Sequence, residues 1–332
     1  MILVTGGTGF VGSHLLYQLT INEEKVRAVY RTESSLEKVR TVFSYYTKSA
    51  ESSFAKIEWI RADITSVPDM IPVFKGITKV YHCAALVSFN PKDYRAMRKI
   101  NIHGTAIVVN LAIDAKVEKL CFVSSIAAVG ESLQGEIVTE ENEWNKNSKN
   151  HGYAISKYGA EMEVWRASQE GVDVIIVNPG VILGPGFWDA GSGKMFLQVH
   201  GGFRFYTEGV TGFVGVKDVV KSMQQLMDSA HKNERYIIVA ENKSFKEIFF
   251  SIADGLGVKR PSMKIKPWQT AIFWRLDMIR TFLTGKEPLI TKHSARSAHE
   301  ETNYSSEKLK KEIDFKFETI EDVIKETSSF FP

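Results

Sequence analysis

Cysteine is scarce in this sequence of 332 residues, which limits the classes of protein it can belong to. Its two cysteines, Cys83 and Cys121, lie in apolar runs, so we expect reduced core thiols rather than a disulfide scaffold. No Cys/His spacing resembles a zinc site, and no metal is expected. A large excess of either charge is also lacking, because the sequence contains 42 Lys and Arg and 39 Asp and Glu. A net charge of +3 is too weak to indicate a nucleic-acid partner.

Long apolar runs are also lacking. No stretch reaches the ~18 uninterrupted apolar residues of a transmembrane helix. The chain opens on a strand-like run, without the basic region and long apolar region of a secretory signal. We therefore expect a cytoplasmic protein with no stable membrane insertion. The composition does not define the oligomeric state, and a homodimer stays open.

The most apolar stretch, 268–283, still contains charged side chains. Its apolar residues recur at helical spacing, which favours an amphipathic helix packed on the protein. A helix lying on a membrane surface is the second interpretation. The residues of this pattern are Trp268, Ile272, Leu276 and Ile279.

The first half of the chain alternates short β-branched runs with longer amphipathic segments. The strand-like runs are 2–4, 26–30, 57–60, 80–83, 120–123 and 174–177. This alternation predicts an α/β fold with a doubly wound parallel sheet, covered by helices on both faces. Residues 1–183 are predicted to form the dinucleotide-binding domain, with additions from 213–240, and 184–332 mostly a smaller lobe for substrate.

The second half is less regular. Glycine and aromatic residues are frequent between 184 and 213, and helical patterns follow at about 217–231 and 244–256. The charged tail predicts two short helices, one starting near Ser305 and one near Thr319, with hydroxyl caps.

A glycine-rich loop follows the first strand. Thr5-Gly6-Gly7-Thr8-Gly9-Phe10-Val11-Gly12 leads from that strand into a helix. Gly6 permits the tight turn, Gly9 lets the backbone approach a pyrophosphate, and Gly12 lets the helix pack closely. The N–H groups and dipole of the helix N-terminus then receive the phosphates. This context indicates a Rossmann fold that binds a dinucleotide.

The end of the second strand bears on the choice of cofactor. NAD-preferring sites carry an acidic residue there, whereas this chain has Tyr30-Arg31-Thr32. Arg31 can pair with a 2′-phosphate, so NADP(H) is the preferred cofactor. Glu33 is near enough to keep NAD(H) open.

A second pattern supplies acid–base chemistry. Tyr153 and Lys157 are four residues apart, which places them on one face of a helix. An ammonium beside a phenol lowers the phenol's pKa from its usual value near 10. Ser124 and Ser125 stand at the end of an apolar strand, in Phe-Val-Ser-Ser-Ile-Ala-Ala-Val-Gly, and provide hydroxyls.

With these residues the sequence resembles the short-chain dehydrogenase/reductase superfamily, in its extended branch, over nearly its whole length. The matching pieces are the glycine loop, Asp63, Ala84-Ala85, Asn101, Ser124-Ser125, Tyr153 with Lys157, Asn178-Pro179-Gly180, Gly184-Pro185-Gly186 and 213–219.

The resemblance implies a role for each matching residue. Tyr153 would be the general acid/base, Lys157 would lower its pKa and hold the nicotinamide ribose, Ser125 would bond the substrate oxygen, and Asn101 would support a proton-relay water. The implied cofactor-binding residues are Gly6, Thr8, Gly9, Phe10, Val11, Gly12, Arg31, Asp63, Ile64, Ala84, Ala85, Ser124, Tyr153, Lys157, Pro179, Gly180 and Val181.

Within this superfamily the resemblance is strongest to the dihydroflavonol 4-reductase and 3β-hydroxysteroid dehydrogenase-like group. Dehydratases carry an acidic residue after the catalytic hydroxyl, where this chain has Ile126 and Ala127. Plant flavonoid reductases place an Asn near Gly130, which disfavours a flavonoid substrate here. We therefore predict an NADP(H)-dependent oxidoreductase for a carbonyl or the matching alcohol. A nucleotide-sugar epimerase with retained NAD and a non-catalytic cofactor sensor are the alternatives.

The substrate is expected to be a small apolar or aromatic molecule. The second lobe is rich in aromatic residues, and a pocket lined by them suits such a compound better than a hydrated sugar. Trp188, just past the nicotinamide segment, and Phe89, from the other side, are the predicted pocket residues.

Overall fold

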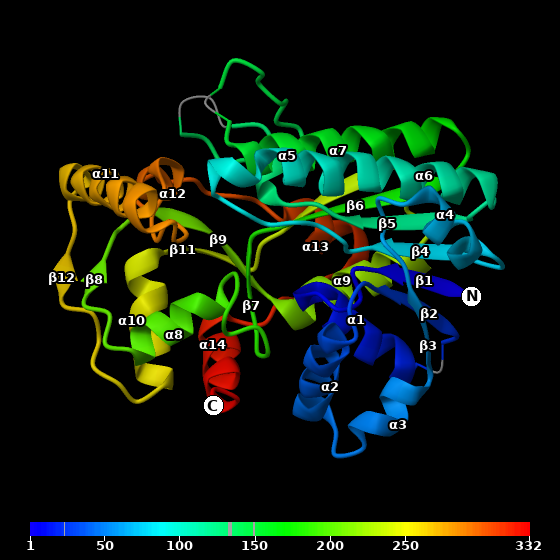
Figure 1. Ribbon diagram of the computed structural model, residues 1–332, viewed down its shortest axis with the longest axis horizontal. Helices are drawn as coiled ribbons and strands as arrows, with labels where there is room; N and C mark the ends of the chain where they lie inside the picture. Colours follow the sequence, from blue (N-terminus) through cyan, green and yellow to red (C-terminus); the bar gives the residue numbers. More distant parts are fainter. Residues whose placement is uncertain (23, 132–134, 149) are drawn as a thin grey trace.

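The structure is a computed structural model that describes residues 1–22, 24–131, 135–148 and 150–332. Seven parallel strands form the main sheet, in the order β10-β6-β5-β4-β1-β2-β3 (Figure 1). They are β1 (Ile2–Thr5), β2 (Val26–Tyr30), β3 (Ile57–Arg61), β4 (Lys79–His82), β5 (Lys119–Val123), β6 (Asp173–Pro179) and β10 (Glu234–Ile238). The chain winds outward in both directions from β1 and β4, so the doubly wound parallel sheet is confirmed.

Helices cover both faces of this sheet (Figure 1). On one face lie α1 (Phe10–Ile21), α2 (Ser34–Tyr46), α3 (Ala50–Ala55) and α9 (Val216–Asp228). On the other lie α4 (Val67–Met70), the 3₁₀ turn η1 (Pro72–Phe74), α5 (Tyr94–Met97), α6 (Gly104–Asp114) and α7 (Gly152–Gln169). Because side chains alternate along a strand, Val4 belongs to the first core and Leu3 to the second. Both faces of each central strand are thus buried, which explains the continuous apolar runs.

A smaller lobe is built on a second sheet, in the order β11-β9-β7. Its elements are β7 (Val181–Leu183), α8 (Gly193–His200), β9 (Val210–Gly215), β11 (Glu241–Ser244), α10 (Phe245–Gly255) and α14 (Ile320–Ser329). Phe196, Phe213, Ile252 and Ile324 form part of its buried core. The predicted cap of the last helix is present, since Thr319 Oγ1 accepts from the N–H of Asp322 at 3.2 Å. Two-residue strands β8 (Phe205–Tyr206) and β12 (Met263–Lys264) pair beside this lobe.

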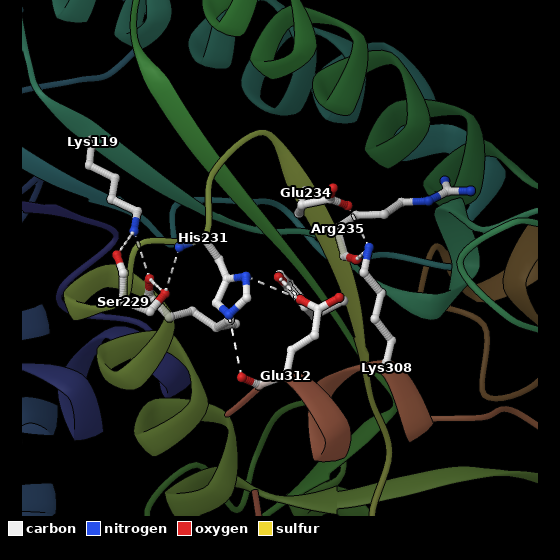
Figure 2. Close-up of polar contacts among 9 residues, drawn as sticks. Lys119, Ser229, His231, Glu234, Arg235, Lys308 and Glu312 are labelled. Atoms are coloured by element: carbon white, nitrogen blue, oxygen red, sulfur yellow. Dashed lines mark hydrogen bonds and ion pairs between the residues drawn. The ribbon is translucent and has the colours of Figure 1, made fainter. Parts of the chain in front are cut away.

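The C-terminal segment returns to the main sheet as α13 (Glu307–Ile313), which lies against β10. Figure 2 shows the polar contacts that fix it, among them Lys308 with Glu234 at 2.5 Å and Glu312 with His231 at 3.4 Å. Ser306 precedes this helix but does not cap it through its side chain. Its hydroxyl instead bonds the backbone N–H and C=O of Val239, and the predicted hydroxyl cap comes from Ser305, whose Oγ accepts from the N–H of Glu307 at 3.3 Å.

The outer end of the molecule carries α11 (Pro267–Thr284) and α12 (Lys292–Ser297) side by side (Figure 1). The helix predicted over 268–283 is present, but the expected packing of its apolar residues is wrong. Trp268, Ile272, Leu276 and Ile279 are all exposed. The helix turns Thr270 and Asp277 inward instead, because these side chains find hydrogen-bond partners there.

Candidate active site

The glycine loop joins β1 to α1 at the carboxyl edge of the main sheet. Gly6 has φ +70°, and a Cβ at this position would lie 2.5 Å from the backbone nitrogen of Ala84. A Cβ at Gly12 would lie 2.2 Å from the carbonyl oxygen of Gly6. Only glycine therefore allows the loop, α1 and the end of β4 to approach so closely.

The N-terminus of α1 is suited to an anion. Its N-cap residue, Gly9, provides no side-chain cap, and the first turn contains no acidic residue. Backbone N–H groups and the positive end of the helix dipole thus stay available for a phosphate. The pyrophosphate of a dinucleotide is an anion that suits this helix end, and a side chain on Gly6 or Gly12 would distort the loop by collision with backbone atoms. Thr8 lies in the loop, the Phe10 ring contacts Phe187 with centroids 5.6 Å apart, and Val11 packs on the core.

The ends of β2 and β3 lie at the same carboxyl edge of the main sheet as the glycine loop. Asp63 accepts hydrogen bonds from the N–H and hydroxyl of Thr65 at 2.8 and 2.9 Å. These bonds, with help from nearby Arg31, lower the pKa of Asp63. Ile64 is buried in the core, so only its backbone faces this edge. The carboxylate of Glu33 is engaged by the Tyr30 hydroxyl at 2.7 Å.

Helix α7, which carries the predicted catalytic pair, begins beside the end of β5. Its N-cap is His151, whose Nδ1 accepts from the N–H of Ala154 at 3.4 Å. Tyr153 lies in the first turn and Lys157 one turn later, and both are buried. The predicted pair thus occupies one helix face, and Ser125 lies close enough to hydrogen-bond the phenol.

Burial controls the protonation of this pair. It raises the pKa of Tyr153 to about 12, and the hydrogen bond with Ser125 opposes that rise. It lowers the pKa of Lys157 to about 8, opposed by the charge of Glu161. Lys157 Nζ donates to the carbonyl oxygen of Val123 at 2.6 Å. At neutral pH both groups carry their proton, as a proton-donating phenol requires.

A buried carboxylate lies behind Lys157 and was missed in the sequence. Glu161, one turn further along α7, accepts from Asn178 Nδ2 at 2.6 Å and lies 3.9 Å from Arg235 Nη1. Burial raises its pKa, while Ser124 and Asn178 oppose the rise. Its spacing of four from Lys157 was the available signal. Ser124 lies near this carboxylate, but its Oγ has no hydrogen-bond partner among the described residues.

Asn101 lies in a π-helical segment, η3 (Arg98–His103). Its side chain bonds the backbone N–H and C=O of Leu86 at 2.7 and 3.0 Å and donates to Ser156 Oγ at 2.9 Å. It therefore connects the segment after β4 with the catalytic helix. Single π-turns occur often at functional sites, since they re-aim one side chain.

The remaining predicted cofactor residues follow neighbouring strands at the same edge. Ala84 and Ala85 come directly after β4, and Gly180 joins β6 to β7 between Pro179 and Val181. A Cβ at Gly180 would lie 2.4 Å from the carbonyl oxygen of Gly212, so this crossing also needs glycine.

Aromatic rings gather beside the catalytic phenol. The half-exposed ring of Phe89 lies 5.9 Å from that of Tyr153 and 6.0 Å from His293. His151 and His293 have ring centroids 3.8 Å apart, and burial lowers the pKa of both. Both are neutral at physiological pH. The two histidines were not predicted, since 142 positions separate them in the sequence.

Trp188 lies elsewhere, in the second lobe. Its ring packs on Phe196 and Phe331, with centroids 5.7 and 5.0 Å apart. The structure therefore brings Phe89, but not Trp188, into ring contact with Tyr153.

Comparison with known proteins places these features in context. A model of an NAD-binding family, described as male sterility protein, matches residues 4–229. Sterol demethylase protein B of Methylococcus capsulatus is 28% identical over 94% of this chain and 92% of its own length. A Synechocystis protein named for dihydroflavonol 4-reductase is 26% identical over 99% of this chain and 93% of its own. Cinnamoyl-CoA reductase 2 of Medicago truncatula is 27% identical over 71% and 70%.

Solved structures show the same architecture. The crystal structure of gox2253 superimposes with a TM-score of 0.82 at 27% identity, covering 100% of this chain and 97% of that one. UDP-glucose 4-epimerase of Thermotoga maritima has a TM-score of 0.76 at 20% identity, covering 99% and 97%. The latter likeness concerns the fold alone.

Proposed function

The chain belongs to the NAD-binding family described as male sterility protein, within the extended short-chain dehydrogenase/reductase superfamily, and on that premise we propose that it is an NADP(H)-dependent reductase of an apolar or aromatic carbonyl compound. Its membership makes it an NAD(P)-dependent enzyme of the reductase type. The observation that carries the proposal is the arrangement of the buried Tyr153 and Lys157 with the half-buried Ser125, at the sheet edge that also carries the glycine loop.

The chemistry follows from the protonation states. When bound, the dinucleotide supplies the hydride. Negative charge then develops on the carbonyl oxygen, and Ser125 stabilises it by a hydrogen bond. Tyr153 donates the proton to that oxygen, and the ammonium of Lys157 stabilises the phenolate left behind. The assigned role of Asn101 is to hold the water through which the proton is restored.

The substrate class rests on the surroundings of Tyr153. Phe89 and the two neutral histidines, His151 and His293, present ring faces rather than charges to a substrate. The named relatives refer to a sterol, a dihydroflavonol and a cinnamoyl thioester, which all contain rings. We retain Phe89 as the main pocket residue and give Trp188 a packing role in the lobe.

The proposal also covers the cofactor, the two lobes, the cellular compartment and the oligomeric state. Arg31 would bind the 2′-phosphate of NADP(H). Residues 1–183 with 213–240 would bind the cofactor, and the rest of 184–332 would bind substrate. The free thiols of the half-buried Cys83 and the buried Cys121 support a reducing, cytoplasmic setting. A homodimer is tested by sedimentation of the purified chain.

Tyr153→Phe tests the catalytic assignment. A screen of aldehydes, ketones and sterols with NADPH first identifies an active substrate. The variant should then lose about 10²–10⁴-fold in kcat, with nearly unchanged cofactor affinity, because the phenol acts on the reacting oxygen. Tyr158→Phe is the matched control, since this tyrosine lies on the same helix and stacks on Trp144 instead.

Other outcomes separate the competing functions. Near-normal kcat in Tyr153→Phe would refute the assignment. NAD(H) retained through purification, with interconversion of nucleotide sugars and no net redox, would favour an epimerase. Cofactor binding without turnover of any carbonyl compound would favour a cofactor sensor.

A further inference from the structure

Helix α11 lies at the outer edge of the molecule (Figure 1), and apolar side chains on it are exposed to solvent. Five residues at spacings of three and four form this stripe, which we call the outer face. They are Trp268, Ile272, Leu276, Ile279 and Leu283, exposed by 61, 47, 57, 52 and 75%. Beside them Phe282 and Leu289 are exposed by 86 and 84%. Scattered apolar residues are normal on surfaces, but a contiguous patch marks an interaction site.

The orientation of α11 is fixed by its polar side. Thr270 Oγ1 lies 3.0 Å from His299 Nε2, and both Thr270 and Asp277 are buried. The Asp277 carboxylate accepts from the N–H groups of Leu289 and Ile290 at 2.6 and 3.1 Å. Rolling the outer face inward would break these bonds and leave the N–H groups of Leu289 and Ile290 without their carboxylate partner. The helix is therefore inverted relative to an ordinary surface helix.

Positive charge is concentrated in the segment that contains the outer face. The segment 259–292 contains eight Lys or Arg and two acidic residues, although the whole chain has a net charge of only +3. In the part of the chain that the structure describes, five of these cations are exposed and have no carboxylate within ion-pair distance. They are Lys259, Lys266, Arg275, Lys286 and Lys292. An apolar stripe with Trp and Phe, flanked by unpaired cations, is complementary to an anionic lipid surface.

The same segment leads to the active site. After α11 the chain passes through Leu289 to α12, where His293 lies 6.0 Å from Phe89, which in turn adjoins Tyr153. A molecule leaving a bilayer at the outer face would thus meet the ring cluster beside the catalytic phenol. No helix among the described residues is long and apolar enough to cross a membrane, so contact from one side is the arrangement that fits.

We propose that the outer face of α11 docks on the surface of an anionic phospholipid bilayer and so takes its apolar carbonyl substrate from the membrane. The docking proposal rests only on the exposure of the outer face and on the charge of the segment that contains it. The route of the substrate also depends on the proposed reductase function.

Vesicle binding by the full chain tests the docking without any turnover measurement. The probes are vesicles of phosphatidylcholine with and without phosphatidylserine, at low and high salt, with sedimentation and tryptophan fluorescence as readouts. Wild type should bind the anionic vesicles, shift its tryptophan emission to the blue as Trp268 leaves water, and dissociate at high salt. Leu276→Gln with Leu283→Gln should weaken binding at least about tenfold. Arg275→Gln with Lys286→Gln should weaken it most at low salt.

Controls separate this proposal from the proposed function. Ile71→Gln changes an exposed apolar residue of the main domain, at 57% exposure, and should bind vesicles like wild type. Tyr153→Phe should also bind normally, so loss of catalysis leaves the docking result intact. Absence of vesicle binding would overturn the docking. So would a stable dimer that the Leu276/Leu283 variant dissociates, because the outer face would then be an interface between two copies.

Discussion

Tyr153 and Lys157 illustrate how burial sets chemistry at the level of a residue. Burial disfavours the charged form of both groups, so it raises the pKa of the phenol to about 12 and lowers that of the ammonium to about 8. The sequence argument, in which lysine lowers the tyrosine pKa, leaves burial out. In the structure desolvation outweighs the opposing hydrogen bond with Ser125, and the phenol stays protonated at neutral pH.

Lys157→Met should reveal the cost of burying this ammonium. In the wild type the folded pKa of about 8 lies below the unfolded value near 10.4, so the unfolded state binds more protons between them. Wild-type stability therefore rises with pH in this window, relative to the variant, and is constant below about pH 8. We expect a relative gain of about 2–3 kcal/mol by pH 10. Chemical denaturation of both proteins at several pH values measures it, and parallel pH profiles would contradict it.

Arg31→Ala should change cofactor choice. The carboxylate of Glu33 accepts a hydrogen bond from the Tyr30 hydroxyl. Arg31 is therefore the side chain at the end of β2 that we expect to bind a 2′-phosphate. We expect NADPH affinity to fall by about tenfold or more, the loss typical of a charge-assisted hydrogen bond, with little change for NADH. Calorimetry with both cofactors gives the answer. Equal wild-type affinities for the two would refute the preference.

At the scale of elements, the connection from β1 to α1 is determined by close backbone approach. Gly12→Ala would place a Cβ 2.2 Å from the carbonyl oxygen of Gly6 and push α1 away from the loop. Dinucleotide affinity should drop at least about tenfold, because the N–H groups would no longer converge on the phosphates.

Gly76→Ala is the control for this element. Gly76 has φ +75° but open space around it, so alanine there should cost about 1 kcal/mol of stability. Its cofactor affinity should match wild type. Cofactor titration of the two variants distinguishes general destabilisation from damage to the glycine loop. Unchanged cofactor affinity in Gly12→Ala would contradict the prediction, because the loop would then tolerate the displacement of α1.

At the scale of the whole molecule, the C-terminal segment contributes to the buried cores of both lobes. Leu309 on α13 is fully buried in the core under the main sheet, while Ile320 and Ile324 of α14 complete the core of the second lobe. One short stretch of chain therefore joins both cores, and we expect the two lobes to unfold together.

Leu309→Ala should lower the free energy of unfolding by about 2–5 kcal/mol, since it leaves a cavity in a packed core. The transition should stay single when followed by circular dichroism and by tryptophan fluorescence. Ile71→Ala, at an exposed site, should change stability by less than about 0.5 kcal/mol. Two separated transitions would contradict the joined cores.

Local pattern alone determined the parallel sheet, the glycine loop and the Tyr153–Lys157 pair. Strand alternation, glycine spacing and helical periodicity act between residues near in sequence, so they can be read without coordinates. The resemblance added assignments for Asn101, Ser125 and the strand-end residues, and the catalytic roles among them stay predictions.

Only the tertiary structure decided which polar groups found partners. Glu161 meets Asn178 and Arg235, and His293 meets His151, through strands and helices far apart in sequence. The direction of α11 was decided in the same way. Its periodicity defines an apolar stripe, but the buried bonds of Thr270 and Asp277 turn that stripe outward. Periodicity fixes which residues share a face, whereas long-range hydrogen bonding decides which face is buried.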